Sequence, residues 1–317
     1  MVEESKTAKQ PVPFLRKWTI AFRPWSYSAS VIPVVFGTSL AVVIGQVRLE
    51  PLRFILALLG MVILHSAANI LSDVFDYRRG LDREVTPVSG AVVRGWITTQ
   101  QAFRAALLFF FIGGLVGLLL VRMSGIVLLW IGLIGVAVGA FYTVLKYHAL
   151  GDLAVFLNFG ILGSLGAWVV QTGAFSWTPV VWAVPISMLV SAILHANNWR
   201  DTVSDRERRI TTIASLLGDS GSLVYYTFLV FGSLAFVAFM IFVPRLLGKP
   251  APPITMPFSF LMVFLALPGA FRLWKRALNR HMPKHPMDFI VLDGATSRHN
   301  MIFGILCVFA VWLDYLV

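Results

Sequence analysis

Apolar stretches long enough to cross a bilayer follow one another along most of this chain. A membrane-spanning helix needs about 20 mainly apolar residues, because the hydrocarbon core of a bilayer is about 30 Å thick. No water bonds the backbone in that layer, so such stretches fold as helices. The sequence therefore predicts an all-α polytopic membrane protein. About nine spans are expected, at residues 27–46, 52–72, 102–121, 125–145, 151–172, 178–198, 221–243, 254–272 and 300–317.

The composition supports a membrane protein and excludes several other classes. Of the 317 residues, 58% are hydrophobic and 13% are charged, whereas about 25% of residues are charged in soluble domains. The net charge of +11 comes from residues spread over short loops, which indicates contact with lipid headgroups and not with nucleic acid. The single cysteine, Cys307, excludes a disulfide framework within the chain and a thiolate metal site.

The distribution of basic residues predicts how the chain is oriented. A basic leader over residues 1–25 precedes the first span and is suited to a short interfacial helix. With the N-terminus inside, 21 of the 26 Lys and Arg residues fall in inside segments. Cytoplasmic loops carry this excess of positive charge, so we expect a cytoplasmic N-terminus. Residues 1–317 are interpreted as one transmembrane domain, and the sequence does not predict its oligomeric state.

A polar cluster lies near the end of the second expected span. Asn69, Asp73 and Asp76 occur at spacings of four and three residues, which place their side chains on one face of a helix. A carboxylate at membrane depth costs about 2.5 to 3.5 kcal/mol even on the lenient insertion scale. Such residues mark a functional site by default.

A second cluster repeats the first about 129 residues later in the sequence. Asn198, Asp201 and Asp205 end the sixth expected span, and we expect them to share one helical face as well. A histidine precedes each cluster, at His65 and His195. For each histidine we expect packing, or a hydrogen bond to Asn or Asp. The repeat predicts two four-helix halves plus one extra helix.

The two clusters together predict an acidic pocket facing the cytoplasm. Four carboxylates that converge in a low dielectric need either protons or cations. Oxygen ligands favour a hard cation such as magnesium, which commonly combines one or two carboxylates with substrate phosphates. The implied ligand is a diphosphate. Solvated helix ends at the membrane surface are the structural alternative, and an ion or proton pathway of a transporter is a functional one.

Both clusters lie within motifs that resemble those of a known family. The segments NILSDVFDYRRGLD and NNWRDTVSDRERRITTIASLLG closely resemble the two aspartate-rich motifs of the UbiA superfamily of intramembrane prenyltransferases. The run DVFDYRRGLD and residues 150–177 are similar to the 1,4-dihydroxy-2-naphthoate polyprenyltransferase arm, MenA. The resemblance covers essentially the whole chain. It implies a helical fold around a central cavity that opens sideways to lipid.

The resemblance also implies roles for individual residues. Two magnesium ions, bridged by the diphosphate of an allylic prenyl donor, would be held by Asp73, Asp76, Asp201 and Asp205. Asn69 and Asn198 would support the metal or the diphosphate, and Asp82 matches the family's following acidic position. The remaining candidates for binding the diphosphate are Lys146 with its neighbour Tyr142, and Arg23, Arg94, Arg200 and Arg206.

The reaction implied by this resemblance is magnesium-dependent transfer of a polyprenyl group to an aromatic acceptor. The MenA arm implies 1,4-dihydroxy-2-naphthoate as acceptor, in menaquinone biosynthesis. Other members of the superfamily use 4-hydroxybenzoate, homogentisate, haem, chlorophyllide or a glycerol-phosphate lipid. A cation- or proton-coupled transporter remains the alternative from a different class.

Overall fold

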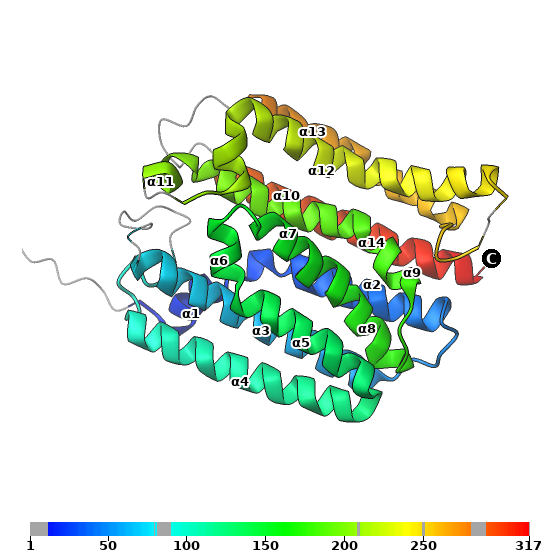
Figure 1. The fold of residues 1–317 in the computed structure, drawn as a ribbon, viewed down its shortest axis with the longest axis horizontal. Helices are drawn as coiled ribbons and strands as arrows, with labels where there is room; N and C mark the ends of the chain where they lie inside the picture. The colour runs from blue at the N-terminus through cyan, green and yellow to red at the C-terminus, as the bar shows by residue number, and fades with distance from the viewer. Residues whose placement is uncertain are drawn as a thin grey trace, which may run out of the picture.

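The computed structural model describes residues 12–78, 80, 90–207, 210–248, 251–279 and 290–316. Within these ranges the chain is helical, and its only β pairing is an isolated bridge between His148 and Thr211. The expected all-α class is confirmed. The helices run side by side along the long axis of the molecule (Figure 1).

The elements follow one another in two groups separated by the turn at residues 173–176. The first group comprises α1 (Phe14–Phe22), η1 (Pro24–Ser26), α2 (Ser28–Val43), α3 (Pro51–Arg78), α4 (Thr99–Ser124), α5 (Ile126–Ala140), α6 (Tyr142–Tyr147), α7 (Gly151–Val155), the π-helical η2 (Phe156–Ile161) and α8 (Leu162–Thr172). The second group comprises α9 (Trp177–Trp182), α10 (Val184–Arg200), α11 (Thr202–Glu207), α12 (Ile213–Leu246), η3 (Phe258–Ala266), α13 (Leu267–Leu278) and α14 (Ile290–Leu316).

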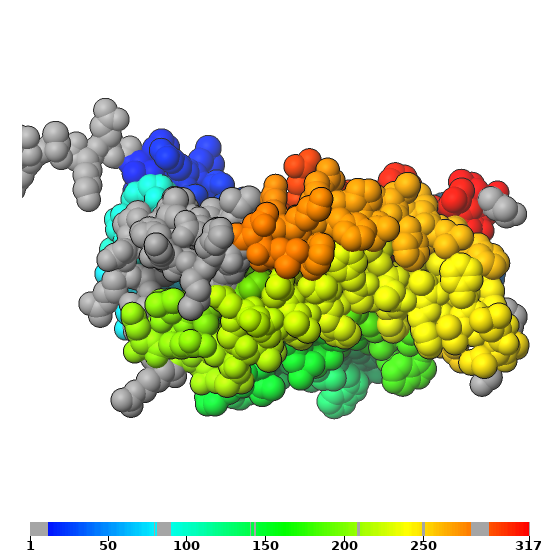
Figure 2. All heavy atoms as spheres, turned by 90° about the horizontal axis from the view of Figure 1, so that it is seen from above, coloured from blue at the N-terminus to red at the C-terminus, as the bar shows by residue number. Residues whose placement is uncertain are grey.

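The interior of the molecule is formed mainly by α2, α8, α10 and α14. Helix α10 lies against α12 and α14, and α2 lies against α8 and α14. Most side chains of α2 and α10 are buried, whereas α4 and α5 expose many large apolar side chains. Helices α12 and α13 cover the face seen in Figure 2. An exposed apolar surface of this extent suits contact with lipid chains.

Six helices in the described part of the chain are long and apolar enough to cross a membrane. The number rises to seven if α1 and η1, bent by 54° against α2, form one broken span with it. The chain is thus an integral multi-pass membrane protein. Helix α1 lies within the expected leader and exposes Phe14 and Leu15. Residues 1–11 of that leader lie outside the described residues.

The expected boundaries of the last two spans are wrong. The segment expected at 254–272 is a 3₁₀ helix followed by α13, which continues to Leu278. Helix α14 begins at Ile290 and not at residue 300. Its early turns carry Thr296 and Asn300, which are buried against protein. Hydropathy underestimated the length of this helix. Its early turns contain polar side chains that face other helices, and by composition alone such a segment resembles a loop.

An apolar cavity of about 710 Å³ lies between α7, η2, α10 and α12. Its lining is largely aliphatic and aromatic, including Phe156, Phe228 and Phe236. Asp152, in the first turn of α7, is the single ionisable carboxyl group on its wall.

Candidate functional site

Asp73 occupies the most enclosed position of the first motif. The side chain lies on α3 and is 1% exposed. Its Oδ2 accepts a hydrogen bond from the backbone N–H of Val92 at 3.1 Å, and its Oδ1 lies 3.7 Å from Nη2 of Arg23. The buried Oδ1 has no hydrogen-bond partner among the described residues. A buried carboxylate oxygen in this state is suited to an additional cation.

The segment that follows the first motif folds back over Asp73 at Gly90. A Cβ atom at Gly90 would lie 1.8 Å from Oδ1 and 2.2 Å from Cγ of Asp73. Glycine therefore permits the backbone to approach the carboxylate closely. Ala91 and Val92 continue this segment into an apolar cluster with Ile70 and Val74 of α3, which holds it in place.

Gly90→Ala is expected to lower the melting temperature of the protein. The added Cβ overlaps Cγ of Asp73, so rotating the carboxylate alone does not relieve the contact and the backbone must shift. Overpacking of this kind costs about 1–3 kcal/mol. Thermal unfolding in detergent measures the effect. Gly114→Ala in α4, where a Cβ meets nothing within 4 Å, is the matched control, and equal melting temperatures would contradict the prediction.

Asp76 connects the first motif to α6. Its Oδ2 accepts a hydrogen bond from Oγ of Ser72 at 3.1 Å and lies 3.6 Å from Nζ of Lys146. Its Oδ1 accepts from the phenol of Tyr147 at 3.2 Å. The backbone carbonyl of Tyr147 accepts from the N–H of Thr211, in the segment after α11. One short helix therefore contacts Asp76 and also holds the chain that follows the second motif.

Lys146 interacts with both motifs. Burial alone would lower the pKa of its ammonium group, but the negative charge of Asp76, the nearby Tyr142 and the charge of Asp205 together raise this pKa above its ordinary value. The lysine is consequently positively charged throughout the neutral pH range. Lys146 therefore pairs directly with Asp76 of the first motif, and its ammonium group is also affected by the charge of Asp205 of the second motif.

The second motif departs from the expected continuous helix. Helix α10 ends at Arg200, and Asp201 has the non-helical angles φ −91° and ψ 9° before α11 begins at Thr202. Hydroxyl groups at this break donate to nearby carbonyls, from Thr202 to Trp199 and from Ser204 to Asp201. Such bonds compete with the helical backbone pattern. The expectation that the three polar residues share one unbroken helical face is therefore corrected.

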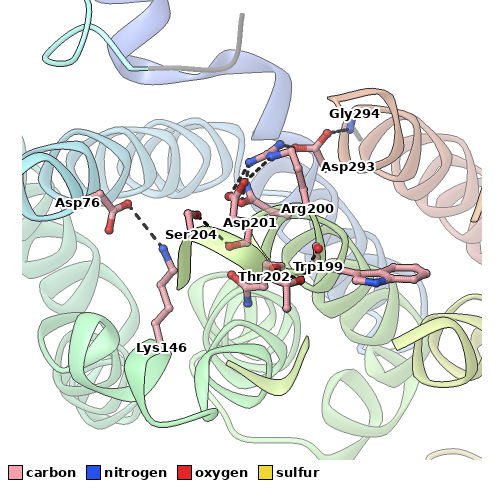
Figure 3. A network of polar contacts seen from close by, with 11 residues as sticks. Asp76, Lys146, Trp199, Arg200, Asp201, Thr202, Ser204, Asp293 and Gly294 are labelled. Carbon is pink, nitrogen blue, oxygen red and sulfur yellow. Dashed lines mark hydrogen bonds and ion pairs between the residues drawn. The ribbon is translucent and has the colours of Figure 1, made fainter. Parts of the chain in front are cut away.

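Arg200 is held in ion pairs at this break. Its guanidinium donates to both carboxylate oxygens of Asp201, at 2.9 and 3.0 Å, and to Oδ2 of Asp293 on α14 at 2.7 Å (Figure 3). The figure also shows Asp76 and Lys146 as a separate pair at the side of this network. Arg200 thus orients Asp201 and ties α10 to α14. The sequence did not single out Asp293.

The other predicted residues divide into two groups. Arg23 lies beside Asp73, as noted above, and Asn69 donates to the carbonyl of Phe22 at 2.8 Å. Arg94 lies over the ring of Trp96, and Arg206 donates to the carbonyl of Ser215 at the start of α12. The structure thus brings Arg23 to the first motif and ties Asn69 to the end of α1, whereas Arg94 contacts Trp96 and Arg206 contacts the start of α12. Asp82 lies outside the described residues.

The two histidines at matched positions have different partners. His65 lies between the hydroxyl groups of Ser26, at 3.2 Å, and Ser30, at 2.9 Å. Nδ1 of His195 lies 3.2 Å from Oδ2 of Asp152, which matches the expected bond to a carboxylate. Sequence reasoning missed Asp152. The rule that marks an acidic group inside an apolar span as functional would have found it.

The donor set fits magnesium shared with a phosphate ligand. Within the described ranges no group of three or more His, Cys, Asp or Glu side chains is close enough to enclose a metal alone. Magnesium usually takes one or two carboxylates, several waters and substrate phosphates. Asp73, with its buried and unbonded Oδ1, and the partly buried Asp76 are suited to that role.

Comparisons with known proteins show which family this chain resembles. The sequence profile of the UbiA prenyltransferase family matches residues 30–282. UbiA prenyltransferase domain-containing protein 1 of Xenopus tropicalis is 32% identical over 97% of this chain and 86% of that protein. The human protein of the same name is 30% identical over 93% of this chain and 83% of its own length.

Solved structures share the fold. A UbiA homologue from Aeropyrum pernix K1 superposes with a TM-score of 0.64 at 16% identity, covering 92% of this chain and 98% of that one. A UbiA homologue from Archaeoglobus fulgidus bound to GPP and Mg²⁺ has a TM-score of 0.60 at 14% identity, covering 92% of this chain and 99% of its own.

Proposed function

This chain belongs to the UbiA prenyltransferase family, and we propose that it transfers a prenyl group from an allylic prenyl diphosphate to an aromatic acceptor in the membrane. The observation that carries the proposal is the position of Lys146, which lies 3.6 Å from Asp76 of one motif and is close enough to Asp205 of the other for that charge to raise its pKa. Two acidic motifs around one fixed cation form a site suited to a polyanion accompanied by divalent ions. The ligands of the Archaeoglobus homologue, GPP and Mg²⁺, support this assignment.

The carboxylates of both motifs are proposed to hold the donor through magnesium. Asp73, Asp76, Asp201 and Asp205 would hold two ions, which when bound supply positive charge to the leaving diphosphate. Asp73 and Asp201 are each accompanied by an arginine, as Asp76 is by Lys146. These pairs offset the like charges of the acidic groups.

Basic side chains are proposed to bind the diphosphate itself. Lys146 and Arg23 lie within 4 Å of the motif carboxylates, so each can donate hydrogen bonds to phosphate oxygens next to the ions. Donors fixed before the reaction stabilise the negative charge that grows as the allylic C–O bond breaks. The electron-rich ring of the acceptor then forms the new C–C bond, and loss of a ring substituent or a proton restores its aromaticity.

We propose 1,4-dihydroxy-2-naphthoate as the acceptor, in menaquinone biosynthesis. The support is the resemblance of DVFDYRRGLD and of residues 150–177 to the MenA arm. The competing acceptors are 4-hydroxybenzoate, homogentisate, haem, chlorophyllide and a glycerol-phosphate lipid. All of them share the donor chemistry, so they differ only in the second half of the reaction.

The decisive experiment is transfer of a labelled geranyl group by the purified protein in detergent. Each acceptor is offered separately with geranyl diphosphate and magnesium, and the products are separated by chromatography. A product with the naphthoate alone supports the proposal in full. A product with another acceptor corrects the acceptor only. If the protein conducts ions in liposomes and does not bind prenyl diphosphate, the proposed enzymatic function is wrong and the transporter alternative is favoured.

Removal of magnesium is expected to abolish transfer. With excess EDTA, the four motif carboxylates and the donor diphosphate have no divalent ions between them, and charge repulsion opposes binding. We expect product formation to fall at least about 10²-fold, the scale of losing a major electrostatic stabiliser. Magnesium in excess of the chelator should restore the rate. A rate unchanged by EDTA would contradict the metal assignment.

The membrane topology is also a proposal. Nine spans in two four-helix halves plus one helix are obtained if α5, the pair α9 and α10, and the bent α1–α2 segment are added to the six long helices. The basic loops then face the cytoplasm together with the N-terminus. Single cysteines introduced at exposed loop positions of a Cys307→Ser background test this by labelling from either side. Labelling of residues 93–95 only from outside would reverse the orientation.

A further inference from the structure

Asp152 is a buried acidic group next to the second motif that the proposed chemistry does not use. It is 1% exposed and lies in the first turn of α7. Its contacts are with α10, the helix that carries the second motif. A buried carboxylate is unfavourable unless it makes hydrogen bonds. The groups that bond to Asp152 therefore indicate its structural role.

Three polar groups of α10 bond to Asp152. Nδ1 of His195 lies 3.2 Å from Oδ2, and Nδ2 of Asn198 donates to Oδ1 at 3.4 Å. The hydroxyl of Ser191 donates to the backbone carbonyl of the same residue at 2.9 Å. These partners are spaced three and four residues apart, so they form one stripe on α10. Asp152 is the common acceptor for this stripe.

The bond to Asp152 determines which way the Asn198 amide faces. A side-chain amide has one donor end and one acceptor end. With Nδ2 bonded to Asp152, the carbonyl oxygen Oδ1 faces the other way. Asn198 lies three residues before Asp201, and its oxygen is the end of the amide that Asp152 does not bind, so it is the end that can serve the cations proposed for the second motif. An amide turned by 180° would present N–H groups to them and repel them.

Resting on the proposed function, we infer that Asp152 is a positioning residue for magnesium, acting by fixing the amide of Asn198 with its oxygen toward the ion. His195 completes the arrangement by occupying the second carboxylate oxygen, which leaves the first for Asn198. Partners that orient metal ligands typically contribute 10–100-fold to metal affinity, so we expect an effect of about 10-fold or more.

The test measures magnesium affinity without turnover. Purified variants are mixed with geranyl S-thiolodiphosphate, a donor analogue that does not ionise readily, and no acceptor is added. Thermal stabilisation is then followed as magnesium is titrated, which yields an apparent dissociation constant for the ion. Asp152→Leu, which cannot accept a hydrogen bond, is expected to raise this constant at least about 10-fold.

Two further variants separate orientation from charge and from local packing. Asp152→Asn keeps an acceptor for Nδ2 of Asn198 and can still form a hydrogen bond with Nδ1 of His195, so it should stay within about threefold of wild type. Ser191→Ala removes the hydrogen bond to the backbone carbonyl of Asp152 and leaves the bonds to its carboxylate in place. Its magnesium affinity should match that of wild type. If Asp152→Asn is as weak as Asp152→Leu, charge and not orientation matters, and the inference is overturned.

A double-mutant cycle tests whether Asp152 acts through Asn198. In an Asn198→Ala background, Asp152→Leu should weaken magnesium binding no further, whereas independent effects would add. Additive losses overturn the inference. If Asp152→Leu shows no cooperative unfolding transition, Asp152→Ala takes its place in the cycle. If magnesium and the analogue do not stabilise the wild-type protein, the proposed function itself is contradicted. This result is distinct from failure of the inference about Asp152, which requires wild-type binding and additive losses in the variants.

Discussion

Replacing Asp73 by asparagine is expected to lower the rate of prenyl transfer by about 10³-fold, at the upper end of what loss of one strong electrostatic group costs an active site. The side chain is almost fully enclosed, and its Oδ1 makes no hydrogen bond among the described residues. An amide keeps the volume but removes the negative charge that attracts magnesium. It also leaves Arg23, which lies 3.7 Å away, without a negatively charged partner.

The measurement is initial velocity with labelled geranyl diphosphate over a range of magnesium concentrations. The substituted site binds magnesium more weakly, so raising the magnesium concentration should increase the rate. The lost carboxylate is not replaced, so the recovery should be only partial. Asp314→Asn is a matched control, since Asp314 lies near the end of α14 opposite to the end that contacts Arg200. A variant at position 73 that retains more than a tenth of wild-type activity would remove Asp73 from the metal site.

Lys146→Met is expected to have the second large effect, a fall in transfer rate of about 10²-fold or more. The ammonium pairs with Asp76 at 3.6 Å and also interacts with Asp205. Methionine keeps much of the length of the side chain but removes the charge. The two motifs then repel one another, and the leaving diphosphate loses a fixed cation.

The pH dependence of this variant provides a second readout. The acidic neighbours raise the pKa of Lys146 above its ordinary value although burial opposes them, so the wild-type lysine remains charged between pH 6 and 9. Because the pKa of Lys146 is higher in the folded protein than in the unfolded chain, its charge stabilises the folded state at every pH below the ordinary pKa of lysine. This stabilisation is lost only when the pH rises through the higher pKa of the folded protein. The ratio of wild-type to variant rates should therefore be constant across that window.

The conservative change at this position separates charge from shape. Lys146→Arg keeps the positive charge and should lose less activity than Lys146→Met, while Lys275→Met in α13 serves as a control for removing a basic residue elsewhere. If Lys146→Met binds geranyl S-thiolodiphosphate as tightly as wild type and transfers at the same rate, the lysine only anchors the chain at the membrane surface.

The sequence by itself determined the helical class, the membrane location and the two acidic motifs. These properties depend on local patterns. Apolar runs of sufficient length must be helical in lipid, and a carboxylate such as Asp73 inside one is costly wherever the helix packs. The sequence also predicted a hydrogen bond from His195 to an Asn or Asp side chain, but it did not identify Asp152 as the partner.

Only the tertiary structure decided which charges meet. Arg200 and Asp293 are 93 residues apart in sequence, and Asn198 reaches Asp152 across 46 residues. Lys146 joins the two motifs because the short helix α6 follows the end of α5 and lies beside α3. Such contacts depend on how distant helices pack, and helical periodicity shows which face of a helix is polar but not which neighbour that face meets.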